Sequence, residues 1–173
     1  HNLILEKILI THSHYDHISY IDDYIYRLPE IAIYCNEQST KLFKSSNIKG
    51  ICNDEIIMLG EVLLISLHTP GHYHDSICYW IKNKNLLFTG DTMFVGRSGR
   101  TVSKRSDIKE QYNSLYSIIL SLPLNTTILP GHHYGYKMSI SIEENIKISN
   151  FFQCKNLEEF IVVMKKFEAT FNK

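Results

Sequence analysis

The 173-residue chain lacks several features that would assign it to common classes of protein. It has no basic excess, because 18 lysines and arginines balance 18 aspartates and glutamates. A protein that binds mainly to the phosphate backbone needs such an excess, so we expect no nucleic acid partner. The most apolar stretch, residues 56–67, is interrupted by Gly60 and Glu61. It falls short of the roughly 18 apolar residues that span a bilayer, so we expect a soluble protein with no membrane partner.

The four cysteines are far apart and form no C-x-x-C pair. Such spacing is typical of buried thiols in a reducing compartment, and it disfavours a disulfide framework or a zinc ribbon. We therefore expect a cytoplasmic protein.

The length and the 44% hydrophobic content fit a single domain over residues 1–173, with C-terminal helices at 141–169. The chain begins at His1, with no methionine, and a strand is expected already at residues 8–10. We expect the domain to be N-terminally incomplete, with further strands before His1.

Strand-like and helix-like segments alternate along the chain and predict an α/β fold. Strands are expected at residues 7–11, 31–35, 61–67, 76–81, 86–89 and 126–129, and helices at 18–28, 37–45, 107–120, 141–149 and 156–167. Four of the strands run into a loop that carries histidine or aspartate. Strand ends that converge at one sheet edge place such loops in a shared crevice, so we expect one common site. Tyrosines 20, 24, 26 and 116 are expected to face the core or its rim.

The heptad Thr-His-Ser-His-Tyr-Asp-His at residues 11–17 is the densest group of polar ligands among the nine histidines of the chain. Imidazole and carboxylate groups at this spacing can bind zinc, iron or manganese. In an extended segment His12 and His14 point the same way, while Asp16 and His17 turn toward a neighbouring position. Two adjacent metal sites are therefore possible, and a solvated histidine-rich loop is the weaker alternative.

Four motifs in this order resemble the metallo-beta-lactamase superfamily: Thr-His-x-His-x-Asp-His at 11–17, Thr-Pro-Gly-His at 69–72, Gly-Asp-Thr at 90–92 and Pro-Gly-His at 130–132. Within it, residues 88–100 and 130–134 are similar to the glyoxalase II (hydroxyacylglutathione hydrolase) branch and to its persulfide dioxygenase relatives. The resemblance runs from about residue 7 to residue 152. It implies a four-layer αββα sandwich, in which helices cover two facing mixed sheets and which here apparently lacks its N-terminal strands.

The resemblance also implies a site with two divalent metal ions, zinc first and iron or manganese as alternatives. The first metal would be held by His12, His14 and His72, and the second by Asp16, His17 and His132, with Asp91 as the bridge. Asp16 and Asp91 are thus the catalytic carboxylates. A metal-bridging hydroxide would attack the carbonyl of a small-molecule thioester, while a metal stabilises the oxyanion.

Arg100 and Tyr134 match the positions that contact glutathione in glyoxalase II, so the substrate is expected to be a thioester, with glutathione as one candidate for its thiol. A mononuclear-iron persulfide dioxygenase is the alternative, with His12, His72 and Asp91 as a facial triad. Those relatives tend to carry aspartate where this chain has Val102.

Two local departures from the family pattern lie next to the expected ligands. The sequence Tyr-His-Asp-Ser at 73–76 stands where the family commonly has Thr-x-Gly-Ser, and His133 stands where an acidic residue is frequent. We expect His132 to be the ligand in preference to His133. His68 is expected to pack behind the site, His74 to lie on a surface loop, and Lys104 and Arg105 to be solvated.

Overall fold

A computed structural model describes residues 4–171. Its smaller main sheet is parallel, in the order β1 (Lys7–Leu9), β2 (Ala32–Asn36), β3 (Ile48–Ile51). The larger sheet has the order β11-β10-β7-β6-β5-β4, with β10 parallel to β7 and the other pairs antiparallel. Its strands are β4 (Ile56–Leu59), β5 (Val62–His68), β6 (Ile77–Ile81), β7 (Leu86–Gly90), β10 (Thr127–Pro130) and β11 (Ile140–Ser141). A short hairpin follows β7 and consists of β8 (Met93–Phe94) and β9 (Arg97–Ser98).

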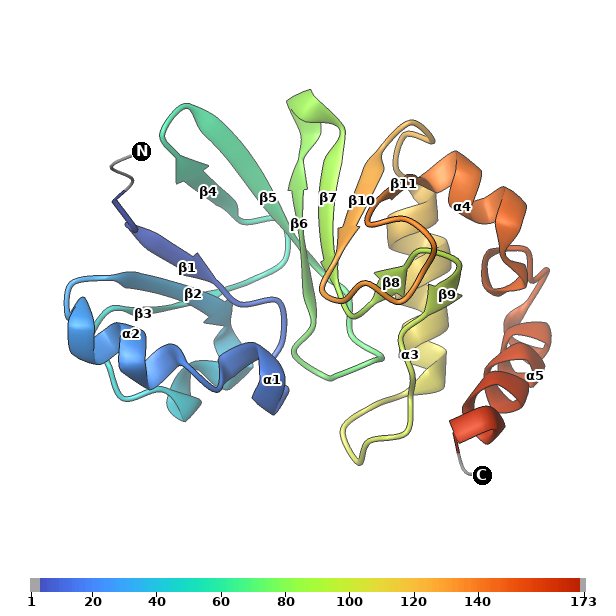
Figure 1. Ribbon diagram of the computed structural model, residues 1–173, viewed down its shortest axis with the longest axis horizontal. Coiled ribbons are helices and arrows are strands. Elements are labelled where there is room, and N and C mark those ends of the chain that lie inside the picture. Colours follow the sequence, from blue (N-terminus) through green and yellow to red (C-terminus); the bar gives the residue numbers. More distant parts are fainter. Residues whose placement is uncertain (1–3, 172–173) are drawn as a thin grey trace.

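Helices lie outside both sheets, as Figure 1 shows. Beside the small sheet lie α1 (Tyr15–Ile18), α2 (Ile21–Arg27) and the 3-10 helix η1 (Glu37–Leu42). Beside the large sheet lie α3 (Ile108–Asn113), α4 (Ile142–Ile148) and α5 (Leu157–Glu168). Short turns complete the described elements: η2 (Lys82–Lys84), the π-helical η3 (Ser114–Ile118), η4 (Ile119–Ser121), η5 (Asn150–Phe152) and η6 (Ala169–Phe171).

Three separate hydrophobic clusters correspond to the three interfaces of a four-layer sandwich. Ile21 of α2 packs against Ile33 and Cys35 of β2, on the outer face of the small sheet. Tyr34 of β2 points to the opposite face, where it joins Ile77 and Tyr79 of β6 between the two sheets. A third cluster packs the large sheet against α3, α4 and α5. Because neighbouring residues of a strand point to opposite faces, each central strand supplies two interfaces. The expected α/β sandwich is confirmed.

Helix caps in the structure follow the polar residues that precede the helices. The Asp107 carboxylate accepts the backbone N–H groups of Lys109 and Glu110 at 2.8 and 2.9 Å, and so begins α3. The Asn156 side chain accepts the N–H of Glu159 at 3.0 Å and begins α5. Both caps satisfy donors that have no partner within the helix, which explains the helix starts near 107 and 156.

Several expected boundaries were wrong. The helix expected at 18–28 is two helices, and the first begins at Tyr15, inside the histidine-rich loop. The segment expected as a helix at 107–120 changes from α3 to a π turn and then to a 3-10 turn. Five strands, β3, β4, β8, β9 and β11, were not expected at all. The apolar run at 56–67 is the β4–β5 hairpin, and Gly60 turns it with a positive φ of 57°.

Two tyrosines, Tyr20 at the N-cap of α2 and Tyr26 within it, were also predicted wrongly. They are 70% and 88% exposed, because isoleucines already fill the side of α1 and α2 that packs on the small sheet. Tyr24 is 43% exposed, at the rim. Tyr116 does pack against the core beside α5, and its hydroxyl donates to the carbonyl of Phe151 at 3.0 Å.

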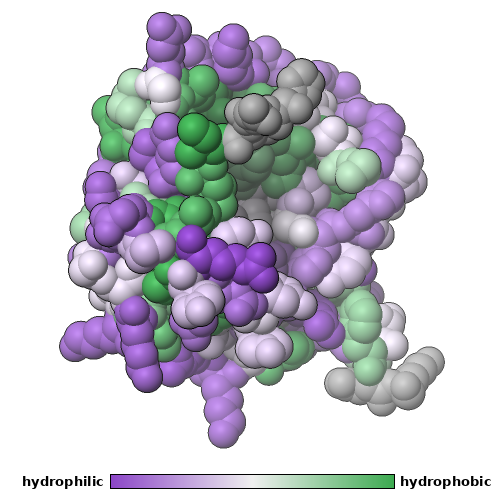
Figure 2. Space-filling view, turned by 60° about the vertical axis from the view of Figure 1, so that its left-hand side comes forward, coloured by the Kyte–Doolittle hydropathy of each residue, from purple (hydrophilic) through white to green (hydrophobic). Residues whose placement is uncertain are grey.

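On the face in Figure 2, hydrophilic residues form most of the outline, and hydrophobic residues gather toward a central hollow. Among residues 4–171, every helix is too short or too polar to serve as a membrane span.

Phe160→Ala tests whether α5 is part of the core. The Phe160 side chain is fully buried in the cluster between the large sheet and the helices. Its removal leaves a cavity, and we expect it to lower the free energy of unfolding by about 3 kcal/mol. Val162 lies on the same helix but is 50% exposed, so Val162→Ala should cost less than about 0.5 kcal/mol. Urea denaturation of both variants measures the difference, and equal midpoints would contradict this packing.

Candidate metal centre

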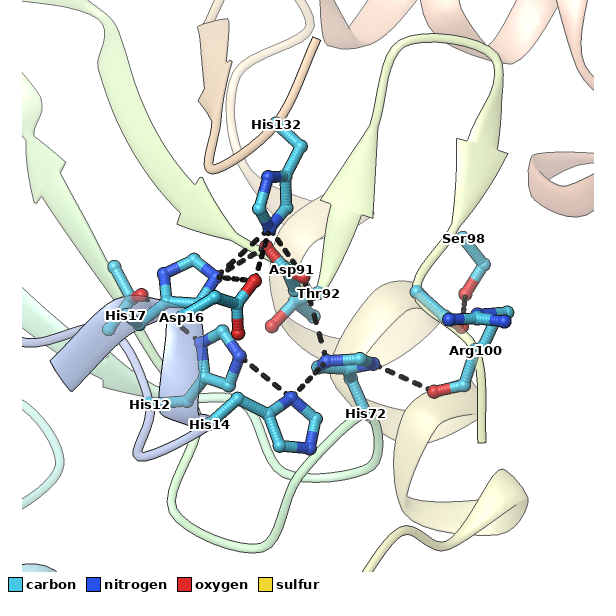
Figure 3. Close-up of polar contacts among 12 residues, drawn as sticks. His12, His14, Asp16, His17, His72, Asp91, Thr92, Ser98, Arg100 and His132 are labelled. Atoms are coloured by element: carbon cyan, nitrogen blue, oxygen red, sulfur yellow. Dashed lines mark hydrogen bonds and ion pairs between the residues drawn. The ribbon is translucent and has the colours of Figure 1, made fainter. Parts of the chain in front are cut away.

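The four motifs meet at one edge of the sandwich. The loops after β1, β5, β7 and β10 carry residues 11–17, 69–72, 90–92 and 130–132. Figure 3 shows their imidazole and carboxylate groups turned toward one another. The structure thus brings together all seven residues that the sequence suggested as ligands: His12, His14, Asp16, His17, His72, Asp91 and His132.

The first group of nitrogens belongs to His12, His14 and His72. His14 Nδ1 lies 3.1 Å from His12 Nε2 and 3.0 Å from His72 Nε2. His14 still has extended backbone at the end of the β1 loop, which places its ring on the same side as that of His12. His72 arrives from the turn after β5, and its Nδ1 donates to the Arg100 carbonyl at 2.8 Å. That bond leaves Nε2 of His72 free to face the centre.

The second group belongs to Asp16, His17 and His132. The Nε2 atoms of His17 and His132 lie 3.1 Å apart, and His132 Nε2 is 3.2 Å from an Asp16 oxygen. Asp16 and His17 lie in the first turn of α1, which rotates them away from His12 and His14. The expected change of direction after His14 therefore has a physical cause, namely the start of a helix.

Asp91 lies between the two groups. Its Oδ1 is 3.4 Å from His17 Nε2, and its Oδ2 is 3.5 Å from His132 Nε2 and 3.7 Å from His72 Nε2. The residue is only 8% exposed. Gly131 allows this approach, because a Cβ there would lie 2.6 Å from Asp91 Oδ1. A side chain at position 131 would therefore displace the carboxylate or the His132 loop.

The donor set fits bound cations better than it fits hydrogen bonds alone. His14 Nδ1 faces two other ring nitrogens, one from His12 and one from His72. A hydrogen that lies between His14 and one of them leaves no hydrogen between His14 and the other. A cation accepts all three lone pairs, and nitrogens about 2.0–2.1 Å from a tetrahedral zinc lie about 3.3 Å apart. Among the described residues, the buried Oδ1 of Asp91 also accepts no well-formed hydrogen bond. Both observations are expected of metal ligands.

The electrostatics of the cluster keep its side chains in forms that can bind a cation. Burial, and then the charge of His17, lower the pKa of His12 to about 2. Burial also lowers the pKa values of His14 and His72, so all three rings are neutral near pH 7 and can offer a lone pair. Burial alone would raise the pKa of the Asp91 carboxyl, but the neighbouring His17, His12 and His72 hold it below its usual range.

His17 differs from the other rings. Burial would lower its pKa, but the nearby carboxylates of Asp91 and Asp16 outweigh this effect and raise it. Without metal, a proton on His17 and the negative charge of Asp91 therefore stabilise each other. Metal binding has to displace that proton, which makes binding weaker at lower pH.

Asp75 fixes the histidine-rich loop and was not recognised from the sequence. Its carboxylate accepts the backbone N–H of Ser13 at 3.1 and 3.2 Å, between His12 and His14, and also the hydroxyl of Ser39. The residue is 2% exposed. It stands where the family commonly has glycine, and the turn is kept because the N–H of Ser76 donates to the Tyr73 carbonyl at 3.3 Å. A sequence pattern cannot show a contact to a residue 62 positions away.

Gln111 of α3 connects three segments of the site and is fully buried. Its Oε1 accepts the backbone N–H of His72 at 2.7 Å. Its Nε2 donates to the carbonyl of Thr92 at 2.7 Å and to the hydroxyl of Ser98 at 2.8 Å. One side chain thus fixes the relative positions of the loop of His72, the turn after Asp91 and strand β9.

The other polar residues discussed from the sequence lie outside the cluster. His133 is exposed, whereas His132 faces the centre. His68 Nε2 lies 3.2 Å from the carbonyl of His74. His74 is half-buried, with an Nδ1 that meets no partner in the described part of the chain, so the expected surface position was wrong. Lys104 and Arg105 are exposed, as expected.

A cavity of about 160 Å³ opens beside the cluster. His72 and Asp91 form its inner wall, and Arg100 and Tyr134, both suggested from the sequence, form part of the rest. The C-terminal segment supplies a further wall through Phe167 and Phe171. Glu168 fixes this wall, because its carboxylate accepts the backbone N–H and the hydroxyl of Thr101 at 2.6 and 3.0 Å.

The chain belongs to the metallo-beta-lactamase superfamily, whose family model matches residues 5–132. It is 32% identical to a probable hydroxyacylglutathione hydrolase, glo2, of Schizosaccharomyces pombe, over 96% of this chain and 60% of the relative. It is 30% identical to a probable polyketide biosynthesis zinc-dependent hydrolase, BaeB, of Bacillus velezensis, over 91% of this chain and 69% of the relative. The chain thus spans about three fifths of the length of the first of these proteins.

A solved structure of similar fold is ETHE1 from Myxococcus xanthus. The TM-score is 0.82 with 28% sequence identity, and the match covers 96% of this chain and 71% of that protein. The relatives therefore include named hydrolases as well as ETHE1, and family membership alone leaves the reaction to be argued from the site.

Gln111→Leu tests the connection between α3 and the ligand loops. The change leaves the N–H of His72 and the carbonyl of Thr92 buried without partners, and we expect a loss of about 2 kcal/mol in stability. Because a displaced ligand binds metal less well, zinc affinity should fall about tenfold or more. Competition with a chromophoric chelator measures the affinity. Gln38 is exposed, so Gln38→Leu is the matched control. Unchanged zinc affinity in Gln111→Leu would reduce Gln111 to a packing residue.

Proposed function

We propose that the protein is a metal-dependent hydrolase of the glyoxalase II type, which cleaves a small-molecule thioester. The observation that carries the proposal is the position of Asp91 between two separate groups of three ligand side chains. Such a set suits two divalent ions, with His12, His14 and His72 on one and Asp16, His17 and His132 on the other. Zinc is the first choice for a site rich in imidazole, and iron or manganese are alternatives.

Two bound metals would polarise the thioester carbonyl and lower the pKa of a water toward neutrality. The chain's own residues prepare that chemistry. Asp91 and Asp16 balance the positive charge, and burial of Asp91 keeps bulk water from screening it. The cavity beside His72 and Asp91 would hold the substrate, with Arg100 and Tyr134 among its contacts.

The names of the relatives support this reaction class. Hydroxyacylglutathione hydrolases act, as their name states, on thioesters of glutathione, and BaeB is described as a zinc-dependent hydrolase. Glutathione-derived thioesters are therefore the first substrates to test. The four cysteines form no disulfide in the described residues, which is in keeping with the cytoplasmic location that we propose.

A one-iron persulfide dioxygenase is the second candidate. It would use His12, His72 and Asp91 as the iron ligands. The uneven burial of the site favours this alternative, because the side chains of His72 and Asp91 are 11% and 10% exposed, but those of His132 and Asp16 are 30% and 60% exposed. A more open second group would bind its metal less firmly.

Asp16→Ala separates the two candidates. In the hydrolase, loss of this carboxylate removes a ligand of the second metal, so the metal content should fall by about one equivalent per chain and thioester hydrolysis should be lost. In the one-iron enzyme the iron content should stay the same. Elemental analysis of protein purified without added metal, together with hydrolysis of S-lactoylglutathione and oxygen uptake on glutathione persulfide, gives the answer. Asp23→Ala, on the exposed side of α2, is the control. Constant metal content and oxygen uptake by the parent would overturn the hydrolase.

Asp91→Asn tests the bridge. The amide keeps the shape of the side chain but removes the negative charge between His17 and His132. We expect the second metal to be lost first and turnover to fall by about 100-fold or more. Metal titration followed by steady-state kinetics checks both effects. Full metal content with normal turnover would exclude Asp91 as the shared ligand.

A further inference from the structure

Arg97 is held against the ring of Tyr134 at the cavity beside the metal centre. The centre of its guanidinium lies 4.0 Å from the Tyr134 ring centroid and 5.7 Å from that of Phe167. Arg97 comes from β9, in the hairpin that follows Asp91, and Tyr134 from the loop that follows His132. Two ligand loops thus contribute the two halves of this stack. Cation–π contact favours such an arrangement and restricts where the guanidinium can lie.

The charge of Arg97 has no counterion among residues 4–171. Its guanidinium makes neither an ion pair nor a hydrogen bond in this part of the chain, and the same is true of Arg100, which lies 4.9 Å from the ring of Phe171. Both arginines line the cavity that also contains His72 and Asp91. Stacking covers the faces of a guanidinium but leaves its N–H groups unpaired, and those groups match a carboxylate or phosphate.

The cavity has a direction. Asp91 is buried at its inner end, whereas Arg100 is exposed and Phe171 is 51% exposed at its outer end. A substrate whose reacting carbonyl lies beside Asp91 must therefore extend an arm toward the arginines. In a glutathione-derived thioester, the first substrate to test, the thiol-bearing part is an arm that carries carboxylates.

We propose that Arg97 is a specificity-determining residue that binds a carboxylate or phosphate on the thiol-bearing part of the substrate, and that Tyr134 acts by holding Arg97 through its ring. The proposal rests on the proposed thioester substrate. It assigns Tyr134 a positioning role, because its hydroxyl has no hydrogen-bond partner in the described residues and its ring is stacked on Arg97. The same ring stacks on His132 at a centroid distance of 5.2 Å, so Tyr134 also links the anion site to the metal centre.

The test measures binding without turnover. Thioethers are used because they cannot be hydrolysed, and each ligand that carries the anionic group is paired with a form in which that group is esterified or absent. The pairs are S-methylglutathione with its dimethyl ester, and S-methyl-4′-phosphopantetheine with S-methylpantetheine. Calorimetry on the full metal-loaded protein gives each dissociation constant. We expect the parent to prefer the charged member of one pair by about tenfold or more, and the pair that shows this preference identifies carboxylate or phosphate as the group bound.

Arg97→Gln should reduce that preference to about twofold or less, and Arg97→Lys should restore only part of it, because an amine lacks the planar fork. Arg105 is exposed and does not line the cavity, so Arg105→Gln should keep the preference of the parent. An Arg97→Gln protein that keeps the preference, or a parent that shows none, would overturn the proposal.

Tyrosine variants test the positioning role. Tyr134→Phe keeps the ring and should keep the preference, whereas Tyr134→Leu should lose as much as Arg97→Gln. The double variant Arg97→Gln/Tyr134→Leu should then bind no worse than either single variant, since both changes remove one interaction. Equal losses in Tyr134→Phe and Tyr134→Leu would show that the hydroxyl contacts the ligand and would reject this role.

Failure of the proposed function is distinguishable from failure of this inference. A parent that hydrolyses no thioester but binds the charged thioether through Arg97 refutes the hydrolase and keeps the anion site. A parent that hydrolyses thioesters with and without the anionic group equally well, and binds the paired thioethers equally, refutes the anion site and keeps the hydrolase.

Discussion

The negative charge of Asp91, buried among imidazole rings, is the interaction on which the rest of the site depends. Ring nitrogens that face each other at about 3 Å repel unless a proton or a cation lies between them. Asp91 is the anion that compensates for this crowding, and it contacts rings from both groups of ligands. A cluster of this kind is stable only if the surrounding chain prevents its loops from moving apart.

Three residues outside the cluster provide that restraint. Asp75 binds the backbone between His12 and His14, Gln111 binds the backbone of His72, and Gly131 allows the last loop to approach Asp91. Each restraint originates in a different layer or loop of the sandwich. The hydrophobic interfaces on both sides of the sheets are therefore connected to the centre through only a few polar contacts. A substitution in the core should change the positions of the clustered side chains mainly by displacing these contacts.

The sequence predicted the residues of the site that belong to short local motifs. All seven residues suggested as ligands converge, because short motifs at strand ends carry both the chemistry and the position of each loop. The α/β sandwich also followed from the same motifs. The edge strands β3 and β4 were missed, since their residues do not alternate clearly and Gly60 hides a turn inside one apolar run. Asp75, Gln111 and Arg97 were missed because their roles depend on contacts between distant segments, which no local pattern records.

The C-terminal segment from Leu157 to Phe171 contributes no side chain to the metal cluster, yet Phe167 and Phe171 line the cavity and Glu168 binds the loop after Arg100. The cavity is thus lined partly by the loops that carry the cluster and partly by a segment that carries none of it. A change in the residues of this helical wall alters the shape of the cavity without altering any of the seven clustered side chains. A shared set of motifs then marks a common arrangement of polar side chains, and the helix behind the cavity, together with the loop residues that face it, is the place to look for differences in substrate between members of the superfamily.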